Sequence, residues 1–308
     1  MTLSYRRKLL LGLLASTPLI VGNAAGPLAP KPASPATVAA QPAMARTLPP
    51  DDGRDADFAN RGFVATLADP VIKDAKGRSV WNLAAYDWVD GPAPASVNPS
   101  LWRLMRHLKR HGLFKVADGV WQVRGFDLAN MTVVAGQTGW ILIDPLTARE
   151  TAAAALTLVN RELGTRPVSA VIYSHSHADH YGGVRGVVNQ ADLAAGKVAV
   201  IAPEHFVAEA ASENVMAGSA MGRRAQYQFG AGLSPGVQGQ MGSGIGMAVA
   251  PGEITLIQPT DTITRSGETR VVDGVPLEFQ IVSGSEAPSE LNVLITPRRV
   301  FLSAEIST

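Results

Sequence analysis

The sequence predicts an α/β fold built in layers, and the alternation of strand-like and helix-like runs carries that prediction. Three β-like runs lie close together, separated by Asn, Gly and Gln-Thr-Gly turn signals, at residues 120–125, 131–134 and 140–143. An Ala-rich helix is predicted at 151–163, and the apolar run 168–174 that follows is typical of a strand buried on both faces. Strands and helices joined by short connections pack as layers around one core.

A second set of strands is predicted nearer the end of the chain. After a further strand at 197–202, its members are the apolar runs 254–257, 269–272, 277–283, 291–296 and 300–303. Asp273-Gly274 supplies a hairpin turn within this set. With 308 residues of which 46% are hydrophobic, the chain has enough apolar material for one large core.

The first 25 residues have the pattern of a signal peptide. Arg6, Arg7 and Lys8 precede an apolar run, and small residues follow at cleavage-site spacing. The apolar run is shorter than the roughly 20 residues of a membrane-spanning helix, which favours cleavage over a permanent anchor. The pattern predicts export to the periplasm or the outside, by a general or a twin-arginine signal, with no permanent membrane span after cleavage.

The chain that follows the signal divides into a linker and one domain. Residues 26–50 are rich in Ala and Pro without a hydrophobic period, which favours an extended tether. Residues 51–308 form the predicted domain, whose first part carries an amphipathic helix at 99–111. A helix at 203–227 and a glycine-rich stretch make up an expected insertion at 203–250.

Composition removes several classes of function. The net charge is +1, from 27 Lys and Arg against 26 Asp and Glu, so the basic surface that a nucleic-acid-binding protein needs is not indicated, and we expect no nucleic-acid partner. The chain has 0 cysteines, which excludes disulfides, thiolate metal sites and cysteine nucleophiles. Histidine and carboxylate side chains remain as the metal ligands that the chain can offer.

Four potential metal ligands lie within six positions, directly after the buried strand at 168–174. They are His175, His177, Asp179 and His180. His175 and His177, two residues apart in extended chain, point to the same side and can bind one ion, while the turn that follows directs Asp179 and His180 toward a second ion. The alternative, a surface cluster without a ligand role, is disfavoured by this spacing.

Two ions need more ligands than these four. Glu286 and Glu305 each follow a predicted strand, where the end of a sheet can place them near the cluster. Other acids are similarly placed and position alone does not separate them from these two: Glu253, Glu268, Glu278 and Glu290. Each of the six can equally be a solvated loop acid.

The His-x-His-x-Asp-His string resembles the signature of the metallo-β-lactamase superfamily, which implies an αββα sandwich. Several further segments resemble the zinc-dependent alkylsulfatases of that superfamily, namely residues 124–132, 144–147, 213–218, 223–228 and 286–290. The resemblance implies that His175, His177 and Glu286 hold a first zinc ion, that Asp179 and His180 hold a second, and that Glu305 bridges them. The resemblance therefore favours Glu286 and Glu305 as metal ligands over the other four acids.

The function that the resemblance implies is hydrolysis of alkyl sulfate esters, such as dodecyl sulfate, to alcohol and sulfate. Two Zn²⁺ ions would activate a bridging water as hydroxide, oriented by Asp179 and Glu305 as catalytic residues. Alkylsulfatases are longer and homodimeric, so the chain resembles the N-terminal part of such a protein, with an incomplete fold. The alternatives are a lactam, thioester or phosphoester hydrolase of the same fold, and an inactive metal-binding fragment.

Overall fold

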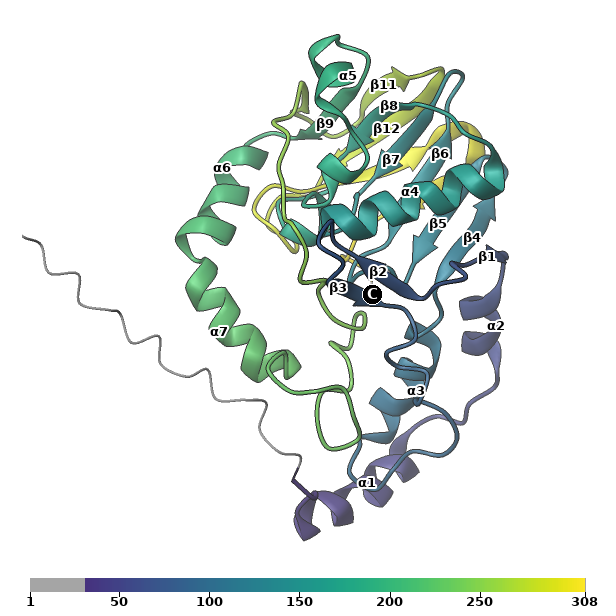
Figure 1. Cartoon of the computed structure of the whole chain (residues 1–308), viewed down its shortest axis with the longest axis vertical. Coiled ribbons are helices and arrows are strands. Elements are labelled where there is room, and N and C mark those ends of the chain that lie inside the picture. Colours follow the sequence, from purple (N-terminus) through teal and green to yellow (C-terminus); the bar gives the residue numbers. More distant parts are fainter. Residues whose placement is uncertain (1–30, 308) are drawn as a thin grey trace, which may run out of the picture.

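The computed structural model describes residues 31–307, so the predicted signal peptide lies outside the described residues (Figure 1). Three sheets are present in the described part. The eight-stranded sheet has the order β1-β4-β5-β6-β7-β8-β9-β10, with β1 at Phe63–Ala65, β4 at Gly112–Ala117, β5 at Val120–Arg124, β6 at Met131–Ala135, β7 at Trp140–Ile143, β8 at Val168–Ile172, β9 at Ala199–Pro203 and β10 at Asp261–Ile263. Its strands are antiparallel from β1 to β7 and parallel from β7 to β10.

The other two sheets are smaller and antiparallel. The four-stranded sheet has the order β11-β12-β13-β14, with β11 at Glu268–Val272, β12 at Val275–Ile281, β13 at Leu291–Ile295 and β14 at Val300–Leu302. A hairpin joins β2 at Val71–Lys73 to β3 at Ser79–Asn82. The predicted strands at 120–125, 131–134, 140–143, 168–174, 197–202, 269–272, 277–283, 291–296 and 300–303 are therefore confirmed, with small shifts at their ends.

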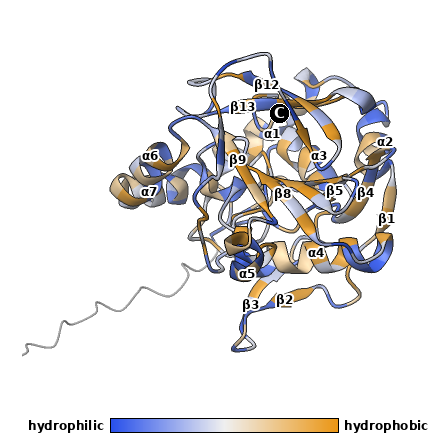
Figure 2. Cartoon of the chain, turned by 90° about the horizontal axis from the view of Figure 1, so that it is seen from above, coloured by the Kyte–Doolittle hydropathy of each residue, from blue (hydrophilic) through white to orange (hydrophobic). Residues whose placement is uncertain are grey.

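The layers follow from the alternation of side chains along the strands. On β7, Trp140 and Leu142 pack with residues of the helix α4 (Arg149–Leu163), while Ile141 and Ile143 face the four-stranded sheet. Seen from above, α4, the strands β5 and β8, and the strands β12 and β13 lie at three successive levels (Figure 2). The α/β fold is confirmed, with one apolar core between helix and sheet and a second between the two sheets.

The outer face of the four-stranded sheet is open to solvent. Along β12, Val275, Leu277 and Phe279 are buried and the alternating residues Pro276 and Glu278 are exposed. Among the described residues no helix covers this face, so the part of the sandwich seen here comprises one helical layer and two sheets. The second helical layer of the predicted αββα arrangement is not among residues 31–307.

Six further helices accompany α4 in the described chain. They are α1 at Pro35–Thr47, α2 at Arg54–Asn60, α3 at Pro99–Leu108, α5 at Gln190–Ala194, α6 at Phe206–Ala211 and α7 at Gly218–Phe229. The predicted helices at 99–111 and 151–163 are confirmed as α3 and α4. No helix in the described range combines the length and the apolar character needed to cross a membrane.

The extended linker predicted at 26–50 is wrong for residues 35–47, which form α1. The Ser34 hydroxyl accepts a hydrogen bond from the backbone N–H of Thr37, and Pro35 occupies the first turn, where a missing N–H costs nothing. Alanine supplies the highest helix propensity of any residue. Ser34 and Pro35 are thus a helix start signal in the sequence. Because α1 buries none of its residues, the segment has no hydrophobic period that would have indicated a helix.

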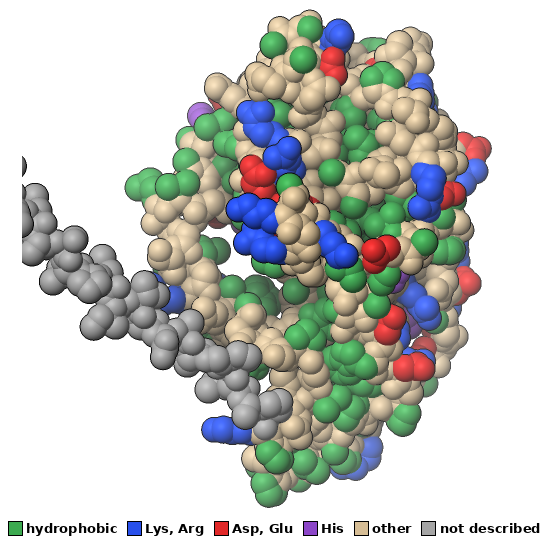
Figure 3. Space-filling view, in the orientation of Figure 1, with side chains coloured by type: hydrophobic (Ala, Val, Ile, Leu, Met, Phe, Trp, Pro, Cys, Tyr) green, Lys and Arg blue, Asp and Glu red, His purple; other side chains and the backbone are tan. Residues whose placement is uncertain are grey.

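Two other predictions differ from the structure. The helix predicted at 203–227 is broken into α6, a π-helical turn at Ser212–Met216 and α7, which together form an arm beside a hollow in the surface (Figure 3). Residues 254–257 form no strand, because Thr255 bonds to the backbone of Gly182 instead of a sheet neighbour.

Candidate metal centre

Asp144 organises the loop that carries the predicted ligands. It directly follows β7, and its carboxylate accepts hydrogen bonds from the backbone N–H and the hydroxyl of Ser174, both at 2.7 Å. Oδ2 of Asp144 also accepts from Nδ1 of His180 at 2.9 Å. Because β7 and β8 are parallel neighbours, their ends meet at one edge of the sheet. Asp144 therefore fixes both the start of the loop and the ring of His180.

Gly182 and Gly183 let this loop pack closely against the chain between β7 and α4. A Cβ atom on Gly182 would lie 2.2 Å from the carbonyl oxygen of Thr147, and one on Gly183 would lie 2.2 Å from that of Pro145. Glycine is required at both positions for this close approach of two backbones and not for an unusual conformation, because neither glycine has a positive φ.

The predicted ligands form two overlapping groups. One donor atom from each of His175, His177, Glu286 and Glu305 lies within 4.8 Å of the others, and the same holds for Asp179, His180 and Glu305. Glu305 belongs to both groups, so the donors of the two groups are adjacent. The structure thus brings together all six residues that the sequence predicts as ligands, and it divides them in the way that the resemblance implies.

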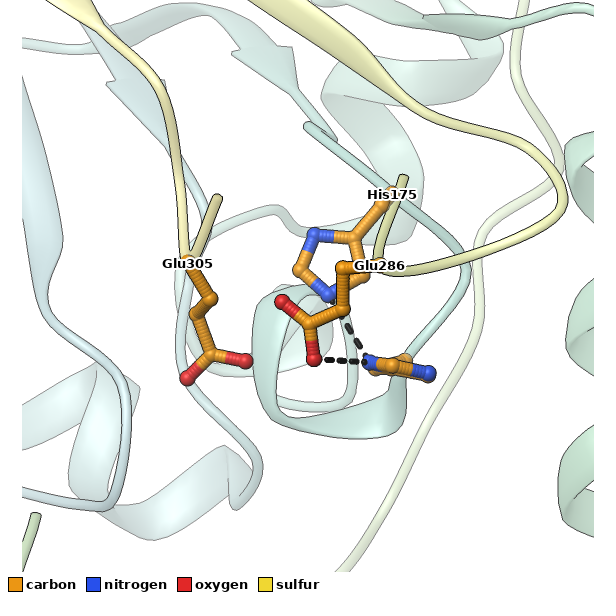
Figure 4. A group of neighbouring side chains, drawn as sticks. His175, Glu286 and Glu305 are labelled. Carbon is orange, nitrogen blue, oxygen red and sulfur yellow. Dashed lines mark hydrogen bonds and ion pairs between the residues drawn. The ribbon is translucent and has the colours of Figure 1, made fainter. Parts of the chain in front are cut away.

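The first group joins segments from both large sheets. His175 is fully buried, and its Nε2 lies 3.0 Å from Nδ1 of His177. That nitrogen of His177 lies 3.3 Å from Oε1 of Glu286, on the loop between β12 and β13. Figure 4 shows the side chains of His175, Glu286 and Glu305 turned toward one another from three separate segments. Two imidazoles and two carboxylates make up a donor set that suits zinc.

The second group centres on His180. Its Nε2 is buried and has no hydrogen-bond partner in the described chain, although Oδ2 of Asp179 and Oε2 of Glu305 lie 3.4 Å and 3.6 Å away. Nδ1 of the same ring donates to Asp144, so Nε2 is the nitrogen that faces the two carboxylates. This arrangement, a free imidazole nitrogen beside two acids with the opposite nitrogen held by a carboxylate, is that of a metal-binding histidine. The residues fit the ions that the resemblance implies.

The pKa values of these groups reflect burial and crowding. Burial lowers the pKa of His175 to about 3, with a further contribution from His180. Burial opposes the charged form of His180, but the Asp179 and Asp144 carboxylates outweigh it and raise the pKa of His180. Burial, together with the neighbouring Asp179 and Glu286 carboxylates, raises the pKa of Glu305. Such shifts in a cluster of ionisable groups are typical of functional sites.

A cavity of about 430 Å³ leads from this cluster to the surface between the two sheets. The polar part of its lining includes Ser174, His180 and Glu305. Its walls are mainly aliphatic, with Leu108 from α3, Val120 from β5 and Leu302 from β14 among them. The glycine-rich part of the 203–250 segment contributes only Gly244 and Ile245 to this lining.

The acids that the sequence could not separate lie in different surroundings. Glu253 forms an exposed ion pair with Arg149, Glu268 pairs with Arg270, and Glu278 points outward from β12. None of these belongs to either donor group in the described chain. Glu290 is fully buried, and Oε2 of its carboxyl group accepts from the backbone N–H of Glu286.

Two contacts of the site were not predicted as site contacts. The carboxylate of Asp144 holds His180, and Glu213 of the π-helical turn accepts from the Ser176 hydroxyl at 3.2 Å and lies 3.6 Å from Nε2 of His177. Both residues lie in segments that resemble alkylsulfatases, but neither was assigned a role. Asp144 has a positive φ of 57°, an unusual backbone conformation for a residue other than glycine, and no sequence pattern predicted it.

Comparison with known proteins agrees with this geometry. A sequence profile described as "Metallo-beta-lactamase superfamily" matches residues 124–284, which is more than half of the chain. The chain belongs to the metallo-β-lactamase superfamily. Within this superfamily it is 47% identical over 298 residues to a linear primary-alkylsulfatase of Pseudomonas sp., and 44% identical over 307 residues to an (R)-specific secondary-alkylsulfatase of Pseudomonas sp..

These matches cover nearly all of this chain, 96% and 98%, but only 44% and 46% of the relatives. The solved structure of the stereoselective inverting sec-alkylsulfatase Pisa1 from Pseudomonas sp. superposes with a TM-score of 0.83 at 45% identity, over 87% of this chain and 43% of that one. The superfamily fold is thereby confirmed. The chain spans less than half the length of the relatives that it matches, and membership of this superfamily implies metal binding.

Proposed function

We propose that this chain forms the metal centre of an enzyme that hydrolyses alkyl sulfate esters to alcohol and sulfate. The observation that carries the proposal is the convergence of all six predicted ligands into two donor groups that share Glu305. The similarity to alkylsulfatases over nearly the whole chain supports a sulfate ester as the substrate. Zinc is the proposed metal, because the donors are imidazoles and carboxylates.

In this proposal His175, His177 and Glu286 would hold one ion, Asp179 and His180 would hold the other, and Glu305, which belongs to both groups, would serve both. Two divalent cations, when bound, supply Lewis acidity that activates water and neutralises charge on an ester oxygen. Asp144 keeps the proton on Nδ1 of His180, so that Nε2 stays free to ligate. Asp179 and Glu305, 3.4 Å and 3.6 Å from Nε2 of His180, accept the hydrogen bonds that orient the attacking water.

The cavity beside the cluster supports an amphiphilic substrate. An alkyl sulfate has an anionic head and an apolar tail, and the cavity lining combines polar groups of the cluster with mainly aliphatic walls. We place the sulfate group at the cluster and the alkyl chain along these walls. Export to the periplasm or the outside, with the substrate encountered there, remains part of the proposal.

The experiment pairs zinc content of the purified 308-residue chain with sulfate release from dodecyl sulfate. Asp179→Asn is the test variant, since it keeps the shape and removes the charge, and Glu278→Gln, on the exposed face of β12, is the matched control. Sulfate release that is lost in Asp179→Asn and kept in Glu278→Gln supports the proposal. Cleavage of a lactam, thioester or phosphodiester without sulfate release would replace it by another hydrolase of this superfamily.

A second candidate, a metal-binding chain without activity of its own, is favoured by one observation. The Asp179 group has three donors in the described chain and the His175 group has four, while the relatives are more than twice as long. Zinc binding without cleavage of dodecyl sulfate or of the lactam, thioester and phosphodiester substrates would establish that candidate.

A further inference from the structure

Glu286 lies on an exposed loop, although it is one of the proposed ligands. The loop connects β12 to β13, and residues 283–286 are exposed to solvent. The Glu286 side chain is 29% exposed and reaches Nδ1 of His177 at 3.3 Å. A carboxylate on such a loop samples many positions unless its main chain is fixed. The contact that fixes it is therefore important for the site.

Glu290 supplies this contact. Oε2 of its carboxyl group accepts hydrogen bonds from the backbone N–H of Glu286 at 2.8 Å and of Ala287 at 3.1 Å. The side chain is fully buried, so these two bonds form away from competing water. The other oxygen, Oε1, is also buried and has no hydrogen-bond partner in the described chain. Of the two carboxyl oxygens of Glu290, only Oε2 binds the segment that bears Glu286, and it adds to the turn hydrogen bond from Gly284 to Ala287.

The main chain of Glu290 is attached to the histidine loop. Glu290 and His175 are partners in an isolated antiparallel bridge, and the N–H of the next residue, Leu291, donates to the carbonyl of Ser174 at 2.8 Å. This bridge joins the end of β8, in the eight-stranded sheet, to the start of β13, in the four-stranded sheet. One residue therefore contacts the His175 segment with its backbone and the Glu286 segment with its side chain.

We infer that Glu290 is a positioning residue, which sets the place of the Glu286 carboxylate relative to His175 and His177. The inference rests on the proposed metal centre, because its effect is exerted through Glu286. Loss of an outer partner of a metal ligand weakens metal affinity by about 10- to 100-fold. A role in folding alone would lower the stability of the chain without changing the affinity of the folded protein for zinc.

The test measures the zinc affinity of the 308-residue chain by competition with a chromophoric chelator, in wild type, Glu290→Gln and Glu290→Ala. Glutamine keeps one carbonyl oxygen to accept from both N–H groups, and the position of the unpartnered Oε1 receives the amide nitrogen, so affinity stays within about threefold of wild type. Alanine leaves both donors without an acceptor, and the affinity for the first zinc ion falls by about 10- to 100-fold. Glu278→Ala is the matched control on the exposed face of the same sheet.

Glu290→Ala with wild-type zinc affinity would overturn the inference. A wild-type chain that binds no zinc would instead remove the proposed metal centre, so the two failures are distinguishable. If Glu290→Ala does not fold, Glu290→Asp decides, because its carboxylate is one methylene short of the two N–H groups. Affinity about tenfold weaker in Glu290→Asp supports the inference, and unchanged affinity there contradicts it.

Discussion

The two halves of the candidate metal centre are held in different ways. In the half that follows β8, His175 and His180 are buried, at 0% and 3% exposed, and Asp144 anchors the ring of His180, while the side chains of His177 and Asp179 are 24% and 14% exposed. The acidic half lies on connections beside β13 and after β14, and the side chains of Glu286 and Glu305 are 29% and 15% exposed. Two ligands of the histidine half, His175 and His180, are thus fixed by the core of the sandwich, whereas both ligands of the acidic half depend on a few individual contacts.

The largest effect is expected from the anchor of the histidine half. Asp144→Ala leaves Nδ1 of His180 and two donors of Ser174 without their acceptor, and it places alanine at a φ of 57°. We expect the free energy of unfolding to fall by about 3 to 5 kcal/mol, the range for breaking a buried charged network, as measured by urea denaturation. Asp144→Asn tolerates the positive φ and keeps one acceptor oxygen, so its loss should be smaller. Equal losses in the two variants would show that the hydrogen bonds of Asp144 contribute little.

Separate substitutions of Glu305 and Glu286 test the acidic half. Glu305 belongs to both donor groups and Glu286 to one. Glu305→Gln should weaken the binding of both zinc ions, and Glu286→Gln that of one, each by at least the roughly 10- to 100-fold, or about 1.4 to 2.8 kcal/mol, that the loss of an outer partner of a ligand costs. Equilibrium dialysis with elemental analysis gives the number of ions and their affinities. If Glu286→Gln weakens both ions equally, the division into two groups is wrong.

The burial of His175 predicts that the stability of the chain depends on pH. The pKa of His175 is about 3 in the folded protein and the ordinary value is 6.5, so between these values only the unfolded chain binds the proton. The free energy of unfolding without added metal therefore falls as the pH is lowered from 6.5 toward 3, at up to about 1.4 kcal/mol per pH unit from this residue.

His175→Gln removes this contribution, so its slope should be shallower than that of wild type in the same pH range. His205→Asn is the control, because His205 is exposed and lies at a φ of 66°, which asparagine tolerates. Thermal or urea unfolding at a series of pH values gives the slopes. Parallel slopes for wild type and His175→Gln would contradict the prediction.

The smallest effect is expected at the contact between the arm and the histidine half. The Glu213 side chain is 25% exposed, and it accepts from Ser176 and faces His177. Because partly exposed pairs contribute little, Glu213→Gln should lower the free energy of unfolding by no more than about 1 kcal/mol. A loss as large as that of Asp144→Ala would mean that the histidine half also depends on an exposed contact.

The sequence predicted the parts of the fold that local pattern determines. The strands at 140–143 and 168–174 are apolar on both faces, and the helix at 151–163 has strong propensity, so pattern and structure agree there. The strands β1, β2, β3, β4 and β10 were not predicted. The pairing of β1 and β10 depends on partners far away in the sequence, whereas β2 pairs with β3 and β4 with β5 across short connections, and these local hairpins were missed. Residues 254–257 show the reverse case, an apolar run whose tertiary contacts are with Gly182.

The histidine half of the site was predictable from spacing alone, and the acidic half was not. His175, His177, Asp179 and His180 lie together in the sequence, so their proximity in space follows directly from their order. Glu286 and Glu290 are equally placed acids in the sequence, and only the resemblance favoured Glu286. The structure separates them by burial and by contact, since the carboxyl of Glu290 binds backbone N–H groups and that of Glu286 faces His177.

The hydrogen bond from Leu291 to Ser174 has a consequence for the order of folding. It joins chain segments that are far apart in the sequence, and contacts of that kind form late because loop closure costs entropy before they contribute stability. A chain in which only the eight-stranded sheet has formed holds the four ligands after β8 but not Glu286 or Glu305. In the proposed metal centre, an ion would therefore bind with full affinity only after the second sheet has docked, and once bound it would slow the separation of the two sheets.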